Sequence, residues 1–448
     1  MKTSSAVTDT LTKRIRSKEA SIGIVGLGYV GLPLAISYAD GGFNTIGFDI
    51  DAEKTKQINA GQSYIKHIPA DTIGRGVRAG KLAATTDFSQ IREVDAIILC
   101  VPTPLDEHFE PDLSYVVKTI EAIVPYMRAN QAISLESTTY PGTTEEELVS
   151  RVEAAGLRVG IDAFVIYSPE REDPGNPEFA ATNIPKVVGG HTPACLAAGT
   201  ELYGSVFQKI VPVSSTAVAE LTKLLENIYR SVNIGLVNEL KLVADSMGID
   251  IWEVIAAAST KPFGFKPFYP GPGLGGHCIP IDPFYLTWKA REFGIHTRFI
   301  ELAGEINRSM PAHVVRRCAD ALNTQKKPLN GSRVLLIGLA YKPNVDDDRE
   351  SPSYELLDRF QAAGSEIDYH DPYVPIIRPS REHAHWAGKE SVYWDQNTIA
   401  GYDLVVISTW HECLNIDELA QWSQFIVDTR NATATLSADI RLAKTLKA

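Results

Sequence analysis

A glycine-rich stretch near the N-terminus constrains the fold of this chain more than any other feature. The stretch Gly26-Leu27-Gly28-Tyr29-Val30-Gly31 follows an apolar run of strand character and opens a predicted helix. Its glycines permit a tight turn and let backbone N–H groups approach a pyrophosphate at the N-terminus of that helix. The pattern therefore predicts a dinucleotide site, and the alternative is a glycine turn that serves packing alone.

Two charged residues downstream refine this prediction. Asp49 ends the next predicted strand, where a carboxylate accepts hydrogen bonds from ribose hydroxyls and disfavours a 2′-phosphate. Lys54 follows it and could neutralise the pyrophosphate or reach the ribose. We therefore expect the cofactor to be NAD rather than NADP.

Strand and helix patterns alternate through the first half of the chain. We expect a helix at 113–128 and strands at 21–25, 45–49, 96–101, 132–136 and 163–167. This alternation predicts an α/β fold built on a doubly wound parallel sheet.

In the middle of the chain the sequence pattern changes and predicts helices only. Residues 216–247 form one long helical pattern that Gly248 ends, and shorter patterns follow at 252–259, 282–293 and 298–322. The stretch 261–276 is crowded with Phe, Pro and Gly, so we expect it to be an ordered loop.

A second alternating region begins after a polar linker at 324–330 and continues to about residue 440. Four parts are therefore expected: an N-terminal tail at 1–20, a dinucleotide domain at 21–212, a central helical domain at 213–323 and a second α/β domain at 324–448.

Charge and cysteine content exclude several classes of protein. The net charge is −12 and no long run of Lys or Arg occurs, which argues against binding to nucleic acids or anionic membranes. The polar N-terminus lacks the apolar centre of a signal peptide, and no apolar run is long enough to span a membrane. The five cysteines include no CxxC pair, which suits reduced thiols in the cytoplasm. No metal site is expected.

One cysteine stands in an unusual setting. Cys278 follows a Gly-Gly pair and lies four residues before Asp282, where a helix is predicted to begin. Nearby amide donors can stabilise a thiolate in such a position. A nicotinamide enzyme that oxidises an alcohol only to a ketone needs no thiol, whereas one that continues from aldehyde to acid can use it. The alternative is a small, buried, apolar cysteine.

Other polar residues are candidates for the same site. Lys223 and Asn227 lie one turn apart on the long helix. A buried lysine and an amide in these positions could stabilise an oxyanion. The alternative is that both residues lie on a solvent-exposed face of the helix. Glu170 follows a strand and could act as a base or belong to a surface acidic pair. Arg349 could bind phosphate or belong to a solvated charged loop.

Seven motifs in order resemble the nucleotide-sugar 6-dehydrogenases, the UDP-glucose/UDP-N-acetylhexosamine dehydrogenase family. They are GLGYVGLP, VPTP, STTYPGTT, SPERE, the Lys223/Asn227 helix, GPGLGGHCIPIDP and GLAYKPNVDDDRESPS, and they span roughly residues 21–431. The resemblance implies two Rossmann-like, doubly wound parallel-sheet domains joined by a central all-helical segment with a long helix. The first domain would bind NAD, the centre would form a homodimer or homotetramer, and the last would bind the UDP-sugar.

The resemblance also implies a four-electron oxidation with two NAD per sugar. Cys278 matches the nucleophile that captures an aldehyde as a thiohemiacetal, which is oxidised to a thioester and hydrolysed to the 6-carboxylate. Lys223 and Asn227 match the oxyanion-stabilising groups, and Lys223 also matches the first base.

The remaining matched positions handle water and ligands. Asp282 and Thr138 match the pair that holds a water or shuttles protons, and Glu170 matches the residue that assists hydrolysis. The cofactor positions are Gly26, Leu27, Gly28, Tyr29, Val30, Gly31, Asp49, Lys54, Thr103, Ser137 and Arg349. The substrate positions are Phe268, Tyr269, Gly271, Gly273, Gly275, Tyr341 and Lys342.

Two segments depart from the UDP-glucose branch: SPEREDPGN, and the aromatic loop KPFGFKPFYPGPGLGGHC. Both resemble the branch that oxidises UDP-N-acetylglucosamine for bacterial surface polysaccharide, lipopolysaccharide or O-antigen. UDP-glucose, UDP-N-acetylgalactosamine and UDP-N-acetylmannosamine are alternative substrates. Two other classes compete with this one. A two-electron hydroxyacid dehydrogenase would need neither Cys278 nor a C-terminal UDP domain, and a redox-sensing or NAD-binding regulator would turn over no UDP-sugar.

Overall fold

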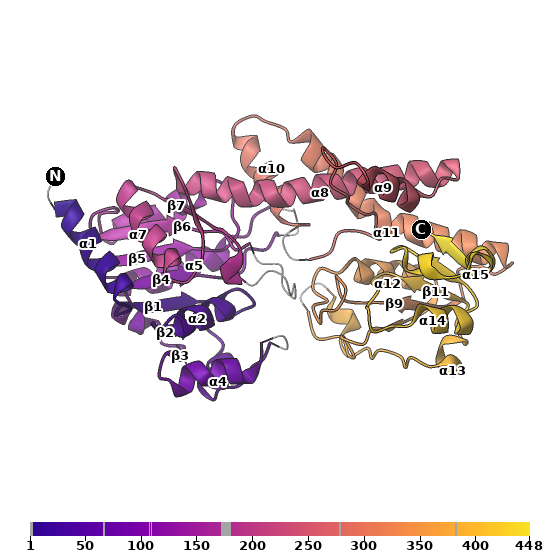
Figure 1. Cartoon of the computed structure of the whole chain (residues 1–448), viewed down its shortest axis with the longest axis horizontal. Coiled ribbons are helices and arrows are strands. Elements are labelled where there is room, and N and C mark those ends of the chain that lie inside the picture. The colour runs from indigo at the N-terminus through magenta and orange to yellow at the C-terminus, as the bar shows by residue number, and fades with distance from the viewer. Residues whose placement is uncertain are drawn as a thin grey trace. The chain divides into compact units, whose positions relative to one another are not determined.

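The computed structural model describes residues 3–65, 68–106, 108, 110–171, 181–276, 279–380 and 383–448. The chain divides into two compact units. The first comprises Met1–Glu226 and Phe284–His296, and the second comprises Asn227–Pro283 and Thr297–Ala448. Each unit contains its own sheet (Figure 1), and the predicted α/β fold class is confirmed.

The first unit is built on an eight-stranded sheet with the order β3-β2-β1-β4-β5-β6-β7-β8. The order reverses between β1 and β4, so the carboxyl ends of these strands face a topological switch point, where ligands bind in open α/β sheets. The strands are β1 (Ser21–Val25), β2 (Asn44–Phe48), β3 (Leu82–Thr85), β4 (Ala96–Leu99), β5 (Gln131–Leu135), β6 (Ala163–Tyr167), β7 (Lys186–Gly190) and β8 (Ile210–Val213).

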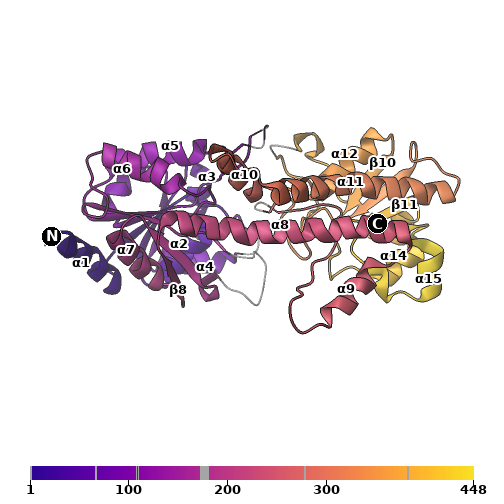
Figure 2. The ribbon, with the colours of Figure 1, turned by 90° about the horizontal axis from the view of Figure 1, so that it is seen from above.

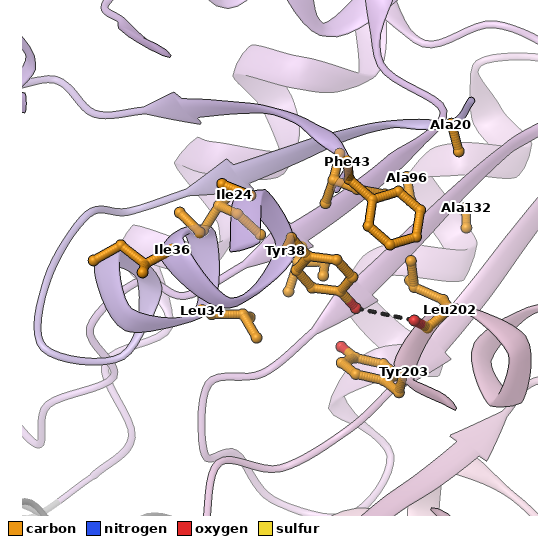
Figure 3. Packing of buried hydrophobic residues seen from close by; sticks show 14 of the residues in the cluster. Ala20, Ile24, Leu34, Ile36, Tyr38, Phe43, Ala96, Ala132, Leu202 and Tyr203 are labelled. Carbon is orange, nitrogen blue, oxygen red and sulfur yellow. Dashed lines mark hydrogen bonds between the residues drawn. The ribbon is translucent and has the colours of Figure 1, made fainter. Parts of the chain in front are cut away.

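Both faces of this sheet are covered, which explains why its strands are apolar throughout rather than alternating. On β4, Ile98 packs into one hydrophobic cluster while Ile97 and Leu99 pack into the other. On the first face, the hydroxyl of Tyr38 donates a hydrogen bond to the carbonyl of Leu202 at 3.3 Å (Figure 3). A buried phenol thereby keeps a polar partner.

The helices of the first unit follow the expected alternation with one shortened element. We expected a helix at 113–128, but α5 ends at Ile123 because Pro125 lacks the N–H that a helix interior needs. The helices are α2 (Gly31–Asp40), α3 (Ala52–Asn59), α4 (Ala70–Arg78), α5 (Ser114–Ile123), the π-helix η3 (Thr144–Val149), α6 (Ser150–Ala154) and α7 (Pro193–Gly204).

Two strands, β7 and β8, run against the other six. β7 pairs antiparallel with β6, with Tyr167 opposite Gly189, whereas the other strand pairs of this sheet are parallel. The sequence pattern did not predict this reversal, because apolar periodicity carries no information about strand direction. The reversal brings Lys186, the first residue of β7, to the carboxyl edge of the sheet.

The segment expected as an N-terminal tail contains a helix, α1 (Thr3–Arg16). Leu11 and Ile15 lie one turn apart, are buried, and join the cluster that also contains residues of α7. Arg14 forms an ion pair with Asp95 at 2.9 Å. Composition alone did not reveal this helix, since two apolar residues in a polar stretch make a weak periodic signal.

A long helix, α8 (Thr216–Met247), leads from the first unit into the second (Figure 2). It ends before Gly248, which has the positive φ of 67° that glycine tolerates at a helix C-terminus. The helices α9 (Ile251–Ser259), α10 (Asp282–Glu292) and α11 (Arg298–Thr324) follow close to their predicted positions. The loop 261–276 contains no helix or strand, as expected.

The second unit ends in a five-stranded parallel sheet with the order β10-β9-β11-β12-β13. Its strands also alternate between two buried clusters, with Leu336 in one and Leu335 in the other. The elements are β9 (Arg333–Ile337), α12 (Pro352–Ala362), β10 (Glu366–His370), α13 (Gln396–Ile399), β11 (Leu404–Ile407), α14 (Ile416–Trp422), β12 (Ile426–Asp428), α15 (Ala438–Lys444) and β13 (Thr445–Lys447). None of the helices in the described part of the chain combines the length and hydropathy of a membrane span.

The packing of α1 yields a test. Ile15→Ala should destabilise the first unit by about 2–5 kcal/mol, because it removes a fully buried side chain and leaves a cavity. The exposed Lys13 on the same helix provides the control, since Lys13→Ala should change stability by less than about 0.5 kcal/mol. The measurement is the midpoint of thermal unfolding, and equal midpoints for the two variants would contradict this account of α1.

Candidate active site

The predicted glycine turn lies between β1 and α2 in the first unit, and its three glycines have three different surroundings. Gly26 has a φ of +91°, and a Cβ there would stand 2.5 Å from the carbonyl oxygen of Cys100. A Cβ on Gly31 would stand 1.8 Å from the carbonyl oxygen of Gly26. Gly28, by contrast, has no atom within 4 Å of its Cβ position. The turn is therefore closed at both ends and open at Gly28, where a pyrophosphate would approach the backbone.

Asp49 lies directly beyond β2, as the sequence predicted, and its carboxylate is held in place. Leu27 donates its backbone N–H to Oδ2 at 2.9 Å, and Asp51 donates to Oδ1 at 3.0 Å. Lys54 Nζ stands 3.5 Å from Oδ2. The carboxylate thus connects the end of β2 to the glycine turn, in the place where ribose hydroxyls bind in dinucleotide folds.

Tyr64 also supports the turn, and sequence reasoning did not identify it. Its hydroxyl donates a hydrogen bond to the carbonyl of Leu27 at 2.5 Å. Burial, with the carboxylates of Asp49 and Asp51 nearby, raises the pKa of Tyr64 well above its usual value, so the hydroxyl keeps its proton as a donor. No sequence motif marks this residue.

The loops after β4 and β5 lie at the same edge of the sheet. Ser137 donates its hydroxyl to the carbonyl of Val101 at 2.6 Å, which ties the two loops together. Thr103 accepts a hydrogen bond at its carbonyl from the buried hydroxyl of Tyr285 at 2.9 Å. Thr138 follows Ser137 and is half-buried. The structure therefore brings Thr103, Ser137 and Thr138 to the edge that carries the glycine turn.

Glu170 stands just beyond β6, at the same edge. Its Oε1 accepts the backbone N–H of Arg171 at 2.6 Å. Arg171 in turn forms a two-pronged ion pair with Glu226 of α8, at 2.6 and 3.2 Å. Residues 168–171 are thereby attached to the start of the long helix, which carries the buried Lys223.

A second contact attaches α8 to the segment that follows β5. The carboxylate of Glu220 accepts hydrogen bonds from the backbone N–H groups of Gly142 and Thr144 at 2.7 and 2.9 Å, and from the Thr144 hydroxyl at 2.7 Å. Glu220 lies one turn before Lys223, and its position caps the start of η3. Burial raises its pKa despite these donors.

In the second unit, Asn227 of α8 and Asp282 of α10 form a direct pair. The amide Nδ2 of Asn227 donates to Oδ2 of Asp282 at 2.5 Å. Asp282 is buried and opens α10, where a carboxylate also complements the helix N-terminus. The sequence placed both residues in one site, and the structure brings them into contact.

The glycine-rich loop before Cys278 is attached at several points within the second unit. Phe268 meets Tyr229 edge to face at 5.7 Å between ring centroids, and Tyr269 stacks on Trp252 at 5.4 Å. The backbone N–H of Gly271 donates to the Oδ1 of Asn238 at 3.1 Å. These contacts place the aromatic part of the loop on α8 and α9.

Asn238 belongs to a chain of buried amides that the sequence did not reveal. Its Nδ2 donates to Oδ1 of Asn307 at 2.9 Å, and Nδ2 of Asn307 donates to the carbonyl of Ser231 at 3.1 Å. Each amide both donates and accepts, so the buried polar groups are satisfied while the loop is held.

The rest of the loop packs on the carboxyl edge of the second sheet. A Cβ on Gly275 would stand 2.9 Å from the Cβ of Tyr341, and one on Gly273 would stand 3.0 Å from Pro352. A Cβ on Gly271 would stand 2.5 Å from Nη1 of Arg430. Close approach to other residues therefore explains why these loop positions are glycine.

Arg430 is a further residue that sequence reasoning missed. Its Nε donates to the carbonyl of Ser408 at 2.6 Å, and burial lowers its pKa to about 10. It lies just beyond β12 at the edge that also carries Tyr341 and Lys342, beyond β9. A shielded guanidinium at the ends of parallel strands suits an anionic ligand.

Arg349, expected to bind cofactor, belongs to the second unit, and its guanidinium pairs with the carboxylate of Asp347 at 2.8 Å for both contacts. A role toward the cofactor stays a prediction.

Cys278 and His277 lie outside the described residues. Within the described ranges, no group of His, Cys, Asp and Glu is arranged to hold a metal ion.

The donor set of the first unit fits NAD. Open backbone at Gly28, a carboxylate at Asp49 and hydroxyl-bearing loops at one sheet edge are the features that hold a pyrophosphate, a ribose and a nicotinamide half. The same chain contains a second parallel α/β sheet, of the kind that binds nucleotides. Together these features define an NAD-dependent dehydrogenase with a separate domain for a further ligand.

Comparisons with known proteins agree with this class. Three domain models of the UDP-glucose/GDP-mannose dehydrogenase family match the chain: the NAD-binding domain at residues 20–207, the central domain at 217–309 and the UDP-binding domain at 335–435. The chain belongs to this family and is an NAD-dependent UDP-sugar dehydrogenase.

Individual relatives act on N-acetylated sugars, according to their names. The chain is 37% identical to UDP-N-acetyl-D-glucosamine 6-dehydrogenase of Pseudomonas aeruginosa, over 80% of this chain and 84% of that one. It is 33% identical to UDP-N-acetyl-D-mannosamine dehydrogenase of Pyrococcus horikoshii, over 92% and 95%. The solved UDP-N-acetyl-mannosamine dehydrogenase of Staphylococcus aureus superposes with a TM-score of 0.80 at 29% identity, over 96% and 98%.

The glycine turn gives a paired test. Gly31→Ala should lower the thermal midpoint and the soluble yield, because its methyl group would collide with the carbonyl of Gly26. Gly28→Ala should leave the midpoint without cofactor unchanged and weaken NAD binding about tenfold or more, equivalent to about 1.4 kcal/mol. Isothermal titration calorimetry with NAD measures the second effect. Wild-type affinity in Gly28→Ala would show that the open side of the turn does not face the cofactor.

Proposed function

We propose that the chain oxidises the C6 hydroxyl of UDP-N-acetyl-D-glucosamine to the 6-carboxylate, for the synthesis of a surface polysaccharide. The observation that carries the covalent chemistry is the hydrogen bond between Asn227 and Asp282, because Asp282 stands four residues after Cys278 in the sequence. The substrate is supported by the similarity to the Pseudomonas aeruginosa enzyme. UDP-N-acetyl-D-mannosamine is the second candidate, supported by the archaeal relative.

In this proposal Cys278 is the nucleophile. Its thiolate attacks the C6 aldehyde formed by the first oxidation, and the resulting thiohemiacetal is oxidised to a thioester. NAD, when bound, supplies the acceptor for the hydride lost in each oxidation. Two other cysteines suit this role less well, because Cys195 and Cys318 are buried and burial raises the pKa of the Cys318 thiol.

The amide of Asn227 and the ammonium of Lys223 stabilise the oxyanions formed at C6. Both project from α8, one turn apart, and Lys223 is buried, which strengthens an interaction with a developing negative charge. Lys223 also serves as the base that accepts the proton of the C6 hydroxyl in the first oxidation.

Water then releases the acid. Glu170 accepts a proton from the water that attacks the thioester, while Asp282 and Thr138 hold that water and pass on protons. The hydrogen bond from Asn227 keeps the carboxylate of Asp282 oriented.

The nucleotide end of the substrate is assigned to the second unit. Tyr341, Lys342 and Arg430 stand at the carboxyl ends of its strands, and the cationic pair suits a diphosphate. The loop containing Gly271, Gly273 and Gly275 packs on this edge and would cover the UDP-sugar. The aromatic residues Phe268 and Tyr269 give the loop apolar surface, which suits the methyl group of an N-acetyl substituent.

Cys278→Ser tests the covalent route. The variant should bind NAD normally but form no 6-carboxylate, because serine does not give a thioester. Wild-type enzyme should yield two NADH per UDP-N-acetyl-D-glucosamine, measured by absorbance and by the mass of the acid product. Full acid formation by the variant, or one NADH per sugar in the wild type, would refute the proposal.

A panel of UDP-sugars tests the substrate in the same assay. We expect kcat/KM for UDP-N-acetyl-D-glucosamine to exceed that for UDP-glucose by about tenfold or more, since the loss of an apolar contact costs about 1–3 kcal/mol. A higher kcat/KM for UDP-N-acetyl-D-mannosamine would transfer the assignment to that epimer.

We also propose that the chain forms a homodimer or homotetramer through the second-unit part of α8. Leu236, Leu240, Val243 and Met247 follow one another at three- and four-residue steps and are 44–65% exposed. Large apolar side chains repeated along one helix face form a surface that a second copy would bury.

The double variant Leu236→Lys/Leu240→Lys should therefore elute as a monomer of about 49.0 kDa in size-exclusion chromatography with light scattering. Charges in the centre of an apolar interface are left without solvent or partners. Tyr393→Lys, at a strongly exposed position outside the helix, is the control and should keep the wild-type mass. An unchanged mass for the double variant would place the interface elsewhere.

A further inference from the structure

The first unit contains two buried charges, Lys186 and Glu136, that the reaction scheme above does not use. Lys186 Nζ lies 2.6 Å from Oε2 of Glu136 and 3.6 Å from Oε2 of Glu170. Lys186 and Glu136 are buried, whereas Glu170 is 19% exposed. The lysine therefore stands between one carboxylate inside the protein and one at the candidate active site.

The reversed strand is what brings these residues together. β6 and β7 run antiparallel with Tyr167 opposite Gly189. Continued beyond the end of β6, the same register places Lys186 opposite Glu170. The hydroxyl of Ser168 donates to the carbonyl of Val187 at 2.8 Å, which keeps the two chains adjacent beyond the ladder. A parallel β7 would have put Lys186 at the opposite edge of the sheet.

Several contacts fix the position of the Lys186 side chain. Its ammonium also donates to the carbonyl of Pro169 at 3.1 Å and lies over the rings of Phe207 and Tyr203, 5.1 and 5.4 Å from their centroids. The contact to Pro169 fixes the backbone immediately before Glu170. The lysine thus restrains both the main chain and the carboxylate of the residue assigned to thioester hydrolysis.

The two carboxylates of the cluster keep the ammonium of Lys186 charged. Burial lowers the pKa of Lys186, but the carboxylates of Glu136 and Glu170 raise it further, so the ammonium stays charged. Burial raises the pKa of Glu136 to about 6, although the lysine opposes this shift.

We propose that Lys186 is a positioning residue for Glu170, that it holds this carboxylate in the orientation needed to deprotonate the attacking water, and that Glu136 holds Lys186. The inference rests on the hydrolytic role proposed for Glu170. In that step a C–O bond forms from water to the acyl carbon, Glu170 takes the proton, and the C–S bond breaks with its electron pair left on sulfur.

The test separates hydrolysis from oxidation. Lys186→Met should form NADH in the first turnover at close to the wild-type rate, but its steady-state turnover should fall about 10- to 100-fold because the base is misplaced. A hexosyl thioester on the enzyme should then accumulate, seen as added mass after acid quenching during turnover with UDP-N-acetyl-D-glucosamine and NAD. Lys186→Arg should restore most of the turnover.

Three further variants make the result interpretable. Glu136→Gln/Lys186→Met removes both buried charges together, so it should fold even if the single variant does not, and it should also accumulate the thioester. Lys209→Met removes an exposed lysine whose carbonyl accepts the N–H of Lys186, and it should behave as wild type. Glu170→Gln should accumulate the thioester without any change at Lys186.

The outcomes distinguish the two proposals. Wild-type turnover in both Lys186→Met and the double variant, or an equal loss of the first NADH and of turnover with no added mass, would overturn the role of Lys186. Absence of the thioester in Glu170→Gln would overturn the assignment of Glu170 itself, and with it the positioning role. Accumulation in Glu170→Gln alone would reject only the inference about Lys186.

Discussion

The close approach of Gly31 to the carbonyl of Gly26 is the constraint on which the cofactor site depends. A Cβ would stand 1.8 Å from that oxygen, so only glycine permits the turn to close. Closure brings the N-terminus of α2 to the carboxyl end of β1 and points Leu27 N–H at Asp49. One backbone contact thereby aligns the turn, the helix and the carboxylate that the cofactor would use.

The same principle organises the rest of the first unit. Parallel strands deliver their carboxyl ends to one edge, so residues far apart in sequence, such as Ser137 and Thr103, become neighbours there. Because β7 runs antiparallel to β6, its first residue, Lys186, lies at this edge; in a fully parallel sheet it would lie at the opposite edge. The edge accordingly carries both the open backbone at Gly28 and the charge cluster around Glu170.

The second unit uses close packing in a similar way. Gly271, Gly273 and Gly275 occur where a Cβ would meet Arg430, Pro352 and Tyr341, so the loop lies on the sheet edge. The buried amides of Asn238 and Asn307 hold the other side of the loop. The sequence motifs singled out the loop, Asn227 and Asp282, but not these supports, because isolated Asn and Arg residues form no periodic or motif signal.

The sequence by itself determined the fold class, the glycine turn with Asp49, the long α8 and the order of the site residues, because periodicity, glycine spacing and strand-end carboxylates are local signals. Only the tertiary structure decided that β7 runs backwards, that α1 packs against α7, and that Tyr64, Glu220, Lys186 and Arg430 support the sites. Those features depend on contacts between segments distant in the chain, and such contacts leave no trace in the spacing of neighbouring residues.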